Sequence, residues 1–129
     1  MTPTITDAAG RTAARRLAVM LFGVGTTHFI APKLFDAIIP AELPGSPRFY
    51  TYTSGVAEIA TGTLLLVPRT RRLAGLGAAV LFISVFPANV NMVRLWWDKP
   101  WPMRAAAIAR LPLQIPMVLQ ALKVWRSPS

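Results

Sequence analysis

The chain alternates between long apolar stretches and short breaks that are rich in proline or in charge. Four apolar segments cover residues 13–31, 51–67, 73–93 and 103–125. Each is close to the length of about 17 to 25 residues with which an α-helix crosses a bilayer. A helix of a soluble bundle, which is the alternative, needs a polar stripe, and residues 64–67 and 73–86 almost entirely lack one. The pattern therefore predicts an all-α, integral membrane four-helix bundle.

The breaks predict how these helices are connected. Residues 68–72 have the sequence PRTRR, which is typical of a tight turn, so the second and third helices should form an antiparallel hairpin. Residues 33–40, KLFDAIIP, are too short to span a bilayer and mix apolar with charged positions. They favour a short interfacial helix or lid between the first two membrane helices. An irregular loop rich in proline follows as far as Pro47.

Basic residues lie mostly at the edges of the apolar segments. The chain holds 14 Lys and Arg against 5 Asp and Glu, a formal net charge of +9. The positive-inside rule favours an arrangement with both termini in the cytoplasm. The basic residues then inside are Arg11, Arg15, Arg16, Arg69, Arg71, Arg72, Lys123 and Arg126, and those outside are Lys33, Arg48, Arg94, Lys99 and Arg104. Nucleic-acid binding is not expected, because no soluble-looking domain is left to present a basic face.

Composition agrees with a membrane protein of one domain. Apolar residues make up 53% of the 129 positions and the mean hydropathy is +0.46, which is high for an ordinary soluble domain. We expect a flexible N-terminal tail at residues 1–12, a membrane domain at 13–125 and a C-terminal tail at 126–129. The basic N-terminal region also resembles a signal peptide, but no small-x-small cleavage site follows it. The chain has no cysteine and one histidine, so we expect no disulfide, thiol couple or metal site.

Polar residues inside the apolar segments are the candidates for function, because an ionisable group in hydrocarbon is costly unless it is paired or hydrated. These residues are His28, Glu58, Asn89, Asn91, Arg110 and Gln114. At about 1.5 Å per residue, Glu58 and Arg110 lie about 10 Å below the outer ends of their helices. His28 and the two asparagines lie about 4 to 8 Å below the same surface. All six should therefore converge in the outer half of the bundle.

Within this cluster we predict an ion pair between Glu58 and Arg110, with His28 and an asparagine hydrogen-bonded nearby. A purely structural interpretation stays open, since buried ion pairs and hydrogen bonds also hold membrane helices together. Prolines inside the segments predict kinks, each freeing a carbonyl for a ligand or for a neighbouring helix. They are Pro87, Pro112 and Pro116.

Four stretches of the chain form a combined motif. They are GVGTTHFIAPKLF at residues 23–35, SGVAEIATGTLLLVPRTRRLAGLG at 54–77, FPANVNM at 86–92 and RLPLQIP at 110–116. Together they resemble the DoxX-like family of small bacterial membrane proteins. The resemblance covers residues 17–122 and implies a multi-pass, four-helix protein of the bacterial plasma (inner) membrane. Its polar positions are matched here by His28, Glu58, Asn89 and Arg110. Some members of that family are associated with thiosulfate:quinone oxidoreductase, and others with membrane oxidoreductase complexes in thiol and oxidative-stress defence.

Three functions are compatible with these features, and the sequence does not decide whether the protein is an enzyme. The first is an accessory or ligand-binding subunit of a membrane oxidoreductase system, with a quinone or a small sulfur anion near Arg110. Glu58 would then orient Arg110, and His28 would move a proton. The second is a non-catalytic structural or assembly subunit, and the third a small proton-coupled transporter. The partners expected are the lipid bilayer, a larger membrane or redox complex, and a second copy of the chain.

Overall fold

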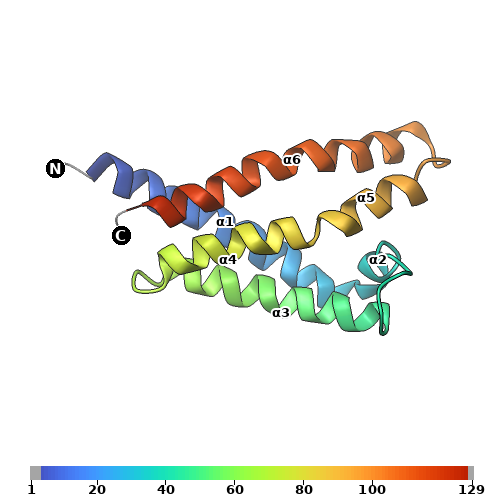
Figure 1. Ribbon diagram of the computed structural model, residues 1–129, viewed down its shortest axis with the longest axis horizontal. Helices are drawn as coiled ribbons and strands as arrows, with labels where there is room; N and C mark the ends of the chain where they lie inside the picture. The colour runs from blue at the N-terminus through green and yellow to red at the C-terminus, as the bar shows by residue number, and fades with distance from the viewer. Residues whose placement is uncertain (1–3, 128–129) are drawn as a thin grey trace.

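The computed structural model describes residues 4–127, and within them all regular structure is helical, with no strand (Figure 1). The all-α prediction is confirmed. The helices are α1 (Thr4–Ile30), α2 (Pro32–Asp36), α3 (Pro47–Leu66), α4 (Arg71–Ser84), α5 (Phe86–Leu95) and α6 (Trp101–Arg126).

The long helices run roughly side by side in an elongated bundle. The most extensive contacts join α1 to α3 and α4 to α6, while α3 and α4 form the predicted hairpin. Figure 1 shows both chain ends and the α3–α4 turn at one end of the bundle, here called the terminal end. The short α2 and the α5–α6 turn lie at the opposite end, here called the lid end.

Helix boundaries differ from the predicted segments at three places. First, α1 begins at Thr4, so residues 4–12, which we expected as a flexible tail, are helical, while residues 1–3 lie outside the described range. Second, the third segment divides into α4 and α5, because Pro87 cannot donate a backbone hydrogen bond to the preceding turn. Third, α6 continues through Pro112 and Pro116 without interruption, so these two prolines do not break the helix.

The terminal end has an apolar core made mostly of small side chains. Its fully buried members include Ala18, Leu65 and Ala78, and Gly75 packs against the backbone of α6. Small residues let helices approach closely, which is the usual way in which helices pack in lipid. A second and smaller core at the lid end contains Ile38, Met92 and Ala107.

Two helical stretches in the described part of the chain are long and apolar enough to cross a membrane. They are Arg71–Leu95, which joins α4 and α5, and Trp101–Arg126, which is α6. The other long helices, α1 with 27 residues and α3 with 20, have sufficient length but do not reach the same apolarity. α1 carries Arg15, Arg16 and His28, and α3 carries Glu58 among several hydroxyl residues.

Candidate functional site

His28 lies in the last turn of α1 and is held from two sides. Its Nδ1 is 2.7 Å from the carbonyl oxygen of Val24, one turn earlier in the helix. Its ring stacks on Phe35 of α2, with the ring centroids 3.7 Å apart and the planes inclined by 19°. A carbonyl oxygen can only accept a hydrogen bond, so Nδ1 carries a proton. Nε2 is therefore the ring atom that His28 presents to its other neighbours.

The neighbour of Nε2 is Glu58, a buried residue of α3. The Nε2 of His28 is 3.2 Å from the Oε1 of Glu58, which is an ion-pair distance. The contact lacks hydrogen-bond alignment, and Oε1 is buried without any hydrogen-bond partner in the described structure. Because Nδ1 already holds the proton of a neutral imidazole, Nε2 and Oε1 are both acceptors unless one further proton lies between them. We call these two residues the His28–Glu58 dyad.

Close packing of α1 on α3 explains why Glu58 meets His28. A Cβ atom placed on Gly55 would lie 2.9 Å from the Cβ of His28, and one on Gly25 would lie 3.1 Å from the carbonyl oxygen of Gly55. The absence of side chains at Gly25 and Gly55 thus lets the helices approach at this level. The predicted ion pair between Glu58 and Arg110 is wrong, since no ion pair joins them within residues 4–127.

Arg110 nevertheless faces the same space as the dyad. It is an exposed residue of α6, and its Nη1 donates to the Sδ of Met92 at 3.4 Å. Its side chain lines two small cavities, of about 70 Å³ and 140 Å³, each of which is also lined by Glu58 and by Asn89 of α5. The smaller cavity contains His28 as well. These two spaces, which we call the polar cavities, therefore bring together side chains from α1, α3, α5 and α6.

The two remaining candidates bind backbone carbonyls. Gln114 lines the larger polar cavity and donates from Nε2 to the carbonyl oxygen of Phe82 at 2.9 Å, just before the break between α4 and α5. Asn91 points to a different place: its Nδ2 donates to the carbonyl oxygen of Ile38 at 2.9 Å, and its Oδ1 accepts from Arg94. Asn91 lines a separate cavity with Arg94, so the structure brings five of the six predicted residues to the polar cavities.

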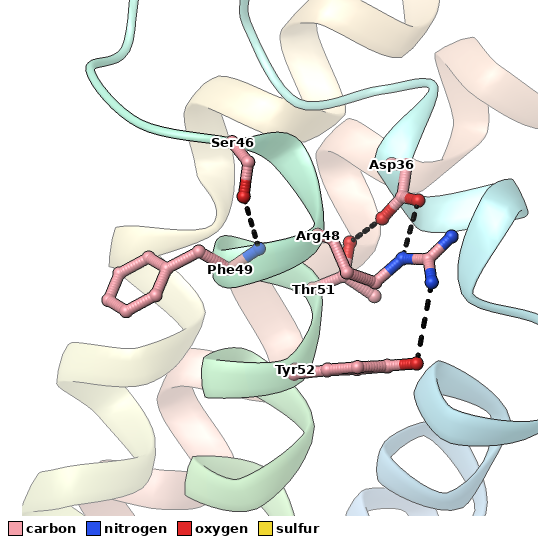
Figure 2. A network of polar contacts seen from close by, with 6 residues as sticks. All are labelled: Asp36, Ser46, Arg48, Phe49, Thr51 and Tyr52. Carbon is pink, nitrogen blue, oxygen red and sulfur yellow. Dashed lines mark hydrogen bonds and ion pairs between the residues drawn. The ribbon is translucent and has the colours of Figure 1, made fainter.

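An acidic residue outside the predicted cluster fastens α2 to α3. Figure 2 shows Asp36 between Thr51 and Arg48: its Oδ1 accepts from Thr51 at 2.6 Å and its Oδ2 from the Nε of Arg48 at 2.8 Å. The hydrogen bond from Thr51 and the nearby Arg48 guanidinium hold the pKa of the Asp36 carboxyl below its ordinary value. Arg48 also reaches the hydroxyl of Tyr52 at 3.4 Å. We call these four residues the lid clamp.

Sequence reasoning missed the lid clamp and the contribution of α2 to the cavity. Phe35, Ile38 and Ile39 line the smaller polar cavity, so α2 and the residues just after it form part of its wall. The predicted site contains only polar groups inside the apolar segments, whereas Asp36 and Arg48 lie on either side of the proline-rich loop. A signal for this ion pair was available in the sequence. Asp36 lies at the end of the short helix α2, and Arg48 lies at the start of the next helix, α3.

A further cavity, larger than the two polar cavities, is apolar and lies apart from the ionisable groups. It has a volume of about 700 Å³ and lies between the α4–α5 junction and α6, with walls that include Phe86, Pro87 and Ile115. Gln114 lines both this apolar groove and the larger polar cavity, so the two spaces meet at its side chain. Among the described residues, no group of three or more His, Asp or Glu side chains could hold a metal ion.

One protein family matches most of the chain. Residues 17–125 match the family described as a domain of unknown function (DUF8561). The chain belongs to this family. The match includes every residue that lines the polar cavities and also the lid clamp. No curated protein and no solved structure matches the chain.

Proposed function

We propose that this DUF8561 protein is a DoxX-like integral membrane protein whose four long helical stretches cross the bacterial plasma membrane with both termini in the cytoplasm. Support comes from the two stretches that are long and apolar enough to cross, and from the packing of α1 and α3 alongside them. The lengths of α1 and α3 correspond to about 40 Å and 30 Å of helix, which is sufficient for a bilayer core of about 30 Å.

In this proposal the protein is an accessory or ligand-binding subunit of a membrane oxidoreductase system. The polar cavities are its ligand site. The observation that carries this function is the convergence of His28, Glu58, Asn89 and Arg110 on shared cavities from four different helices. Structural pairing alone would need only two such residues. Arg110 supplies positive charge and hydrogen-bond donors, and the His28–Glu58 dyad supplies a place for a proton. Because the chain has no cysteine, electrons have to be carried by the ligand or by a partner subunit.

Two ligand classes suit this site. A small anion, such as an oxyanion of sulfur, would be held by the guanidinium of Arg110. A quinone would place its polar ring in the larger polar cavity, and its apolar chain in the apolar groove that begins at Gln114. In both cases Arg110 provides the polar contact.

The experiment is purification of the protein from native membranes, followed by identification of the proteins and lipophilic molecules that accompany it. Arg110→Ala should remove the bound ligand while membrane insertion is retained. Arg94→Ala is the matched control, because Arg94 is an exposed arginine of the neighbouring α5 and contacts Glu42 at 3.7 Å instead of lining the polar cavities. Ligand retention by Arg110→Ala, or equal loss in both variants, would reject the ligand site.

A structural or assembly subunit is the second candidate, and the roles of Asn91 and Gln114 favour it. Both donate to backbone carbonyls of other segments, so they join helices without needing a ligand. If the dyad is also structural, His28→Ala and Glu58→Ala should each lower thermal stability in detergent. The double variant should then be little less stable than either single variant. Unchanged ligand content in all three variants would support this second function.

A further inference from the structure

The dyad has an unusual requirement for one proton. The Nδ1–H of His28 is committed to the carbonyl oxygen of Val24, and the Oε1 of Glu58 has no hydrogen bond although it is buried. With one proton between Nε2 and Oε1 the pair is electrically neutral overall, whether that proton is drawn on the imidazole or on the carboxyl. Without it, an ionised carboxylate remains buried against a ring nitrogen that cannot donate.

The charge in the polar cavities follows from the groups that face them on each element. α1 contributes His28, α3 contributes Glu58 and the hydroxyls of Thr51 and Ser54, and α6 contributes Arg110. The other polar lining groups are the neutral amides of Asn89 and Gln114, while α2 and α4 present apolar lining residues there. Asp36, the acid that ends α2, is paired with Arg48 and does not line either cavity.

Arg110 therefore leaves an unbalanced charge whenever the dyad holds its proton. No carboxylate lies within ion-pair distance of Arg110 in the part of the chain that the structure describes. The lining then carries one excess positive charge, and it becomes neutral when the dyad loses the proton. An unpaired charge at membrane depth is costly, so the protonated site favours a counter-ion of a single negative charge.

We propose that the polar cavities bind a small monovalent anion together with one proton, the anion beside Arg110 and the proton between His28 and Glu58. The proposal rests on the ligand-binding function above and names its substrate class. A weak acid is taken up as its conjugate base plus a proton, with no bond formed to the anion and no change of oxidation state. The net charge of the loaded lining is zero, as it is when both ions are absent.

The dimensions of the cavities agree with such a ligand. Volumes of about 70 Å³ and 140 Å³ exceed what one water molecule needs and are well below the 700 Å³ of the apolar groove, so the space suits a small ligand. An ion of a few heavy atoms fits, with the guanidinium fork of Arg110 and the amide of Asn89 as donors. A dianion would carry one negative charge more than the protonated lining can neutralise, so it should bind more weakly.

Anion binding to the purified protein in lipid nanodiscs tests the proposal. Sodium formate and sodium nitrate serve as monovalent probes and sodium sulfate as the divalent probe. Calorimetry in buffers of different ionisation enthalpy measures both the affinity and the number of protons taken up with each anion. We expect uptake of up to one proton per formate or nitrate on the alkaline side. There the affinity should fall by about tenfold for each pH unit.

Three variants assign this behaviour to the named residues. Glu58→Gln keeps a neutral side chain of the same shape, so it should bind the anion without proton uptake and lose the alkaline fall in affinity. Arg110→Gln should bind neither formate nor nitrate at any pH, whereas Arg94→Gln, the control outside the polar cavities, should behave like the natural protein. If Glu58→Gln does not fold, the proton count of the natural protein with each probe still decides the question.

The outcomes separate this proposal from the broader ligand function. Three results would overturn proton-coupled anion binding and leave a ligand site at Arg110. They are anion binding without proton uptake, an anion affinity of Glu58→Gln that depends on pH as in the natural protein, and sulfate binding as strong as nitrate binding. Binding of a quinone but of none of the three anions would have the same meaning. If neither anions nor quinones bind, both proposals are wrong.

Discussion

Asp36 shows how one side chain can hold the lid of the site in place. Each of its carboxylate oxygens accepts a hydrogen bond from α3, and the residue itself ends α2, which carries Phe35 over His28. Because these contacts favour the ionised form, the pKa of the Asp36 carboxyl is lower than its ordinary value of 3.8. A lowered folded-state pKa adds stability above the ordinary pKa, and that contribution is lost as the pH falls through the lowered value.

We therefore predict that Asp36→Asn slightly lowers the thermal unfolding temperature at neutral pH, and that this difference shrinks on acidification below the ordinary carboxyl pKa of 3.8. The asparagine keeps an oxygen acceptor but loses the ion pair with Arg48. Asp98→Asn is the control, since it changes the same charge at the lid end, where Asp98 has no ion pair among the described residues. A difference between Asp36→Asn and the natural protein that is unchanged at low pH would contradict this role.

A second prediction concerns Gln114, whose amide binds the carbonyl oxygen of Phe82 beside the α4–α5 break. Gln114→Leu would leave that carbonyl without its donor, and hydrogen bonds between membrane helices contribute about 0.5 to 1.5 kcal/mol. The free energy of unfolding in mixed detergent should fall by that amount. Gln120→Leu on the same helix, which removes no contact of this kind, should have a smaller effect. Equal losses in the two variants would show that the bond to Phe82 adds no stability.

At the residue scale, the sequence predicts which polar side chains come together better than it predicts their ion-pair partners. Charged and amide groups inside apolar segments are the candidates because membrane burial is costly, and four of them, His28, Glu58, Asn89 and Arg110, line one cavity. The choice of partner depends on how closely two helices approach, and depth along the helix does not contain that information. Glu58 consequently pairs with His28 across the α1–α3 contact rather than with Arg110.

At the scale of elements, close helix contacts depend on particular glycines. A Cβ atom on Gly75 of α4 would lie 2.8 Å from both the carbonyl oxygen of Ala121 and the backbone nitrogen of Trp125, on α6. Because backbone atoms cannot turn away as a side chain can, the helices would have to separate. A Cβ atom on Gly77, two residues further along α4, would have no atom of another helix within 4 Å. The two glycines therefore form a matched pair.

We predict that Gly75→Ala lowers the free energy of unfolding by about 1 to 3 kcal/mol through overpacking, whereas Gly77→Ala leaves it unchanged or raises it. Chemical denaturation in the same detergent measures both variants. Overpacking at Gly75 should also loosen the core that contains Val124, which faster hydrogen exchange in α6 would reveal. Similar stability of the two variants would show that α4 and α6 adjust without cost.

The elements themselves were largely predictable, because long apolar segments and proline-rich breaks are local signals. Hydropathy placed each long helical region, and the mixed stretch KLFDAIIP correctly predicted a short helix at α2. The effect of a proline inside a segment was less predictable. Pro87 separates α4 from α5, whereas Pro112 and Pro116 remain within α6. Each proline removes one backbone donor, and the sequence does not specify which neighbouring groups bind the carbonyl that it frees.

At the scale of the whole molecule, the two ends differ in charge and in packing. The terminal end holds the small-residue core and the arginines of the α3–α4 turn, among them Arg71, which donates to the carbonyl oxygens of Leu65 and Leu66. The lid end holds the smaller polar cavity and a mixture of acidic and basic residues, including the Asp36–Arg48 and Glu42–Arg94 pairs. In a plasma membrane, the positive-inside rule would orient the terminal end toward the cytoplasm.

This orientation can be tested directly, because the chain has no natural cysteine and a single introduced thiol has no background. In intact cells we expect a membrane-impermeant maleimide to label Leu43→Cys and Asp98→Cys, which lie in the two turns of the lid end (Figure 1). Pro68→Cys, in the α3–α4 turn, should be labelled only after the cells are permeabilised. Ala78→Cys, at a fully buried position, should stay unlabelled in both conditions. Labelling of Pro68→Cys alone in intact cells would reverse the orientation. Opposite behaviour of Leu43→Cys and Asp98→Cys would exclude four crossings, since both turns must lie on one side if α3 to α5 cross the bilayer as a hairpin.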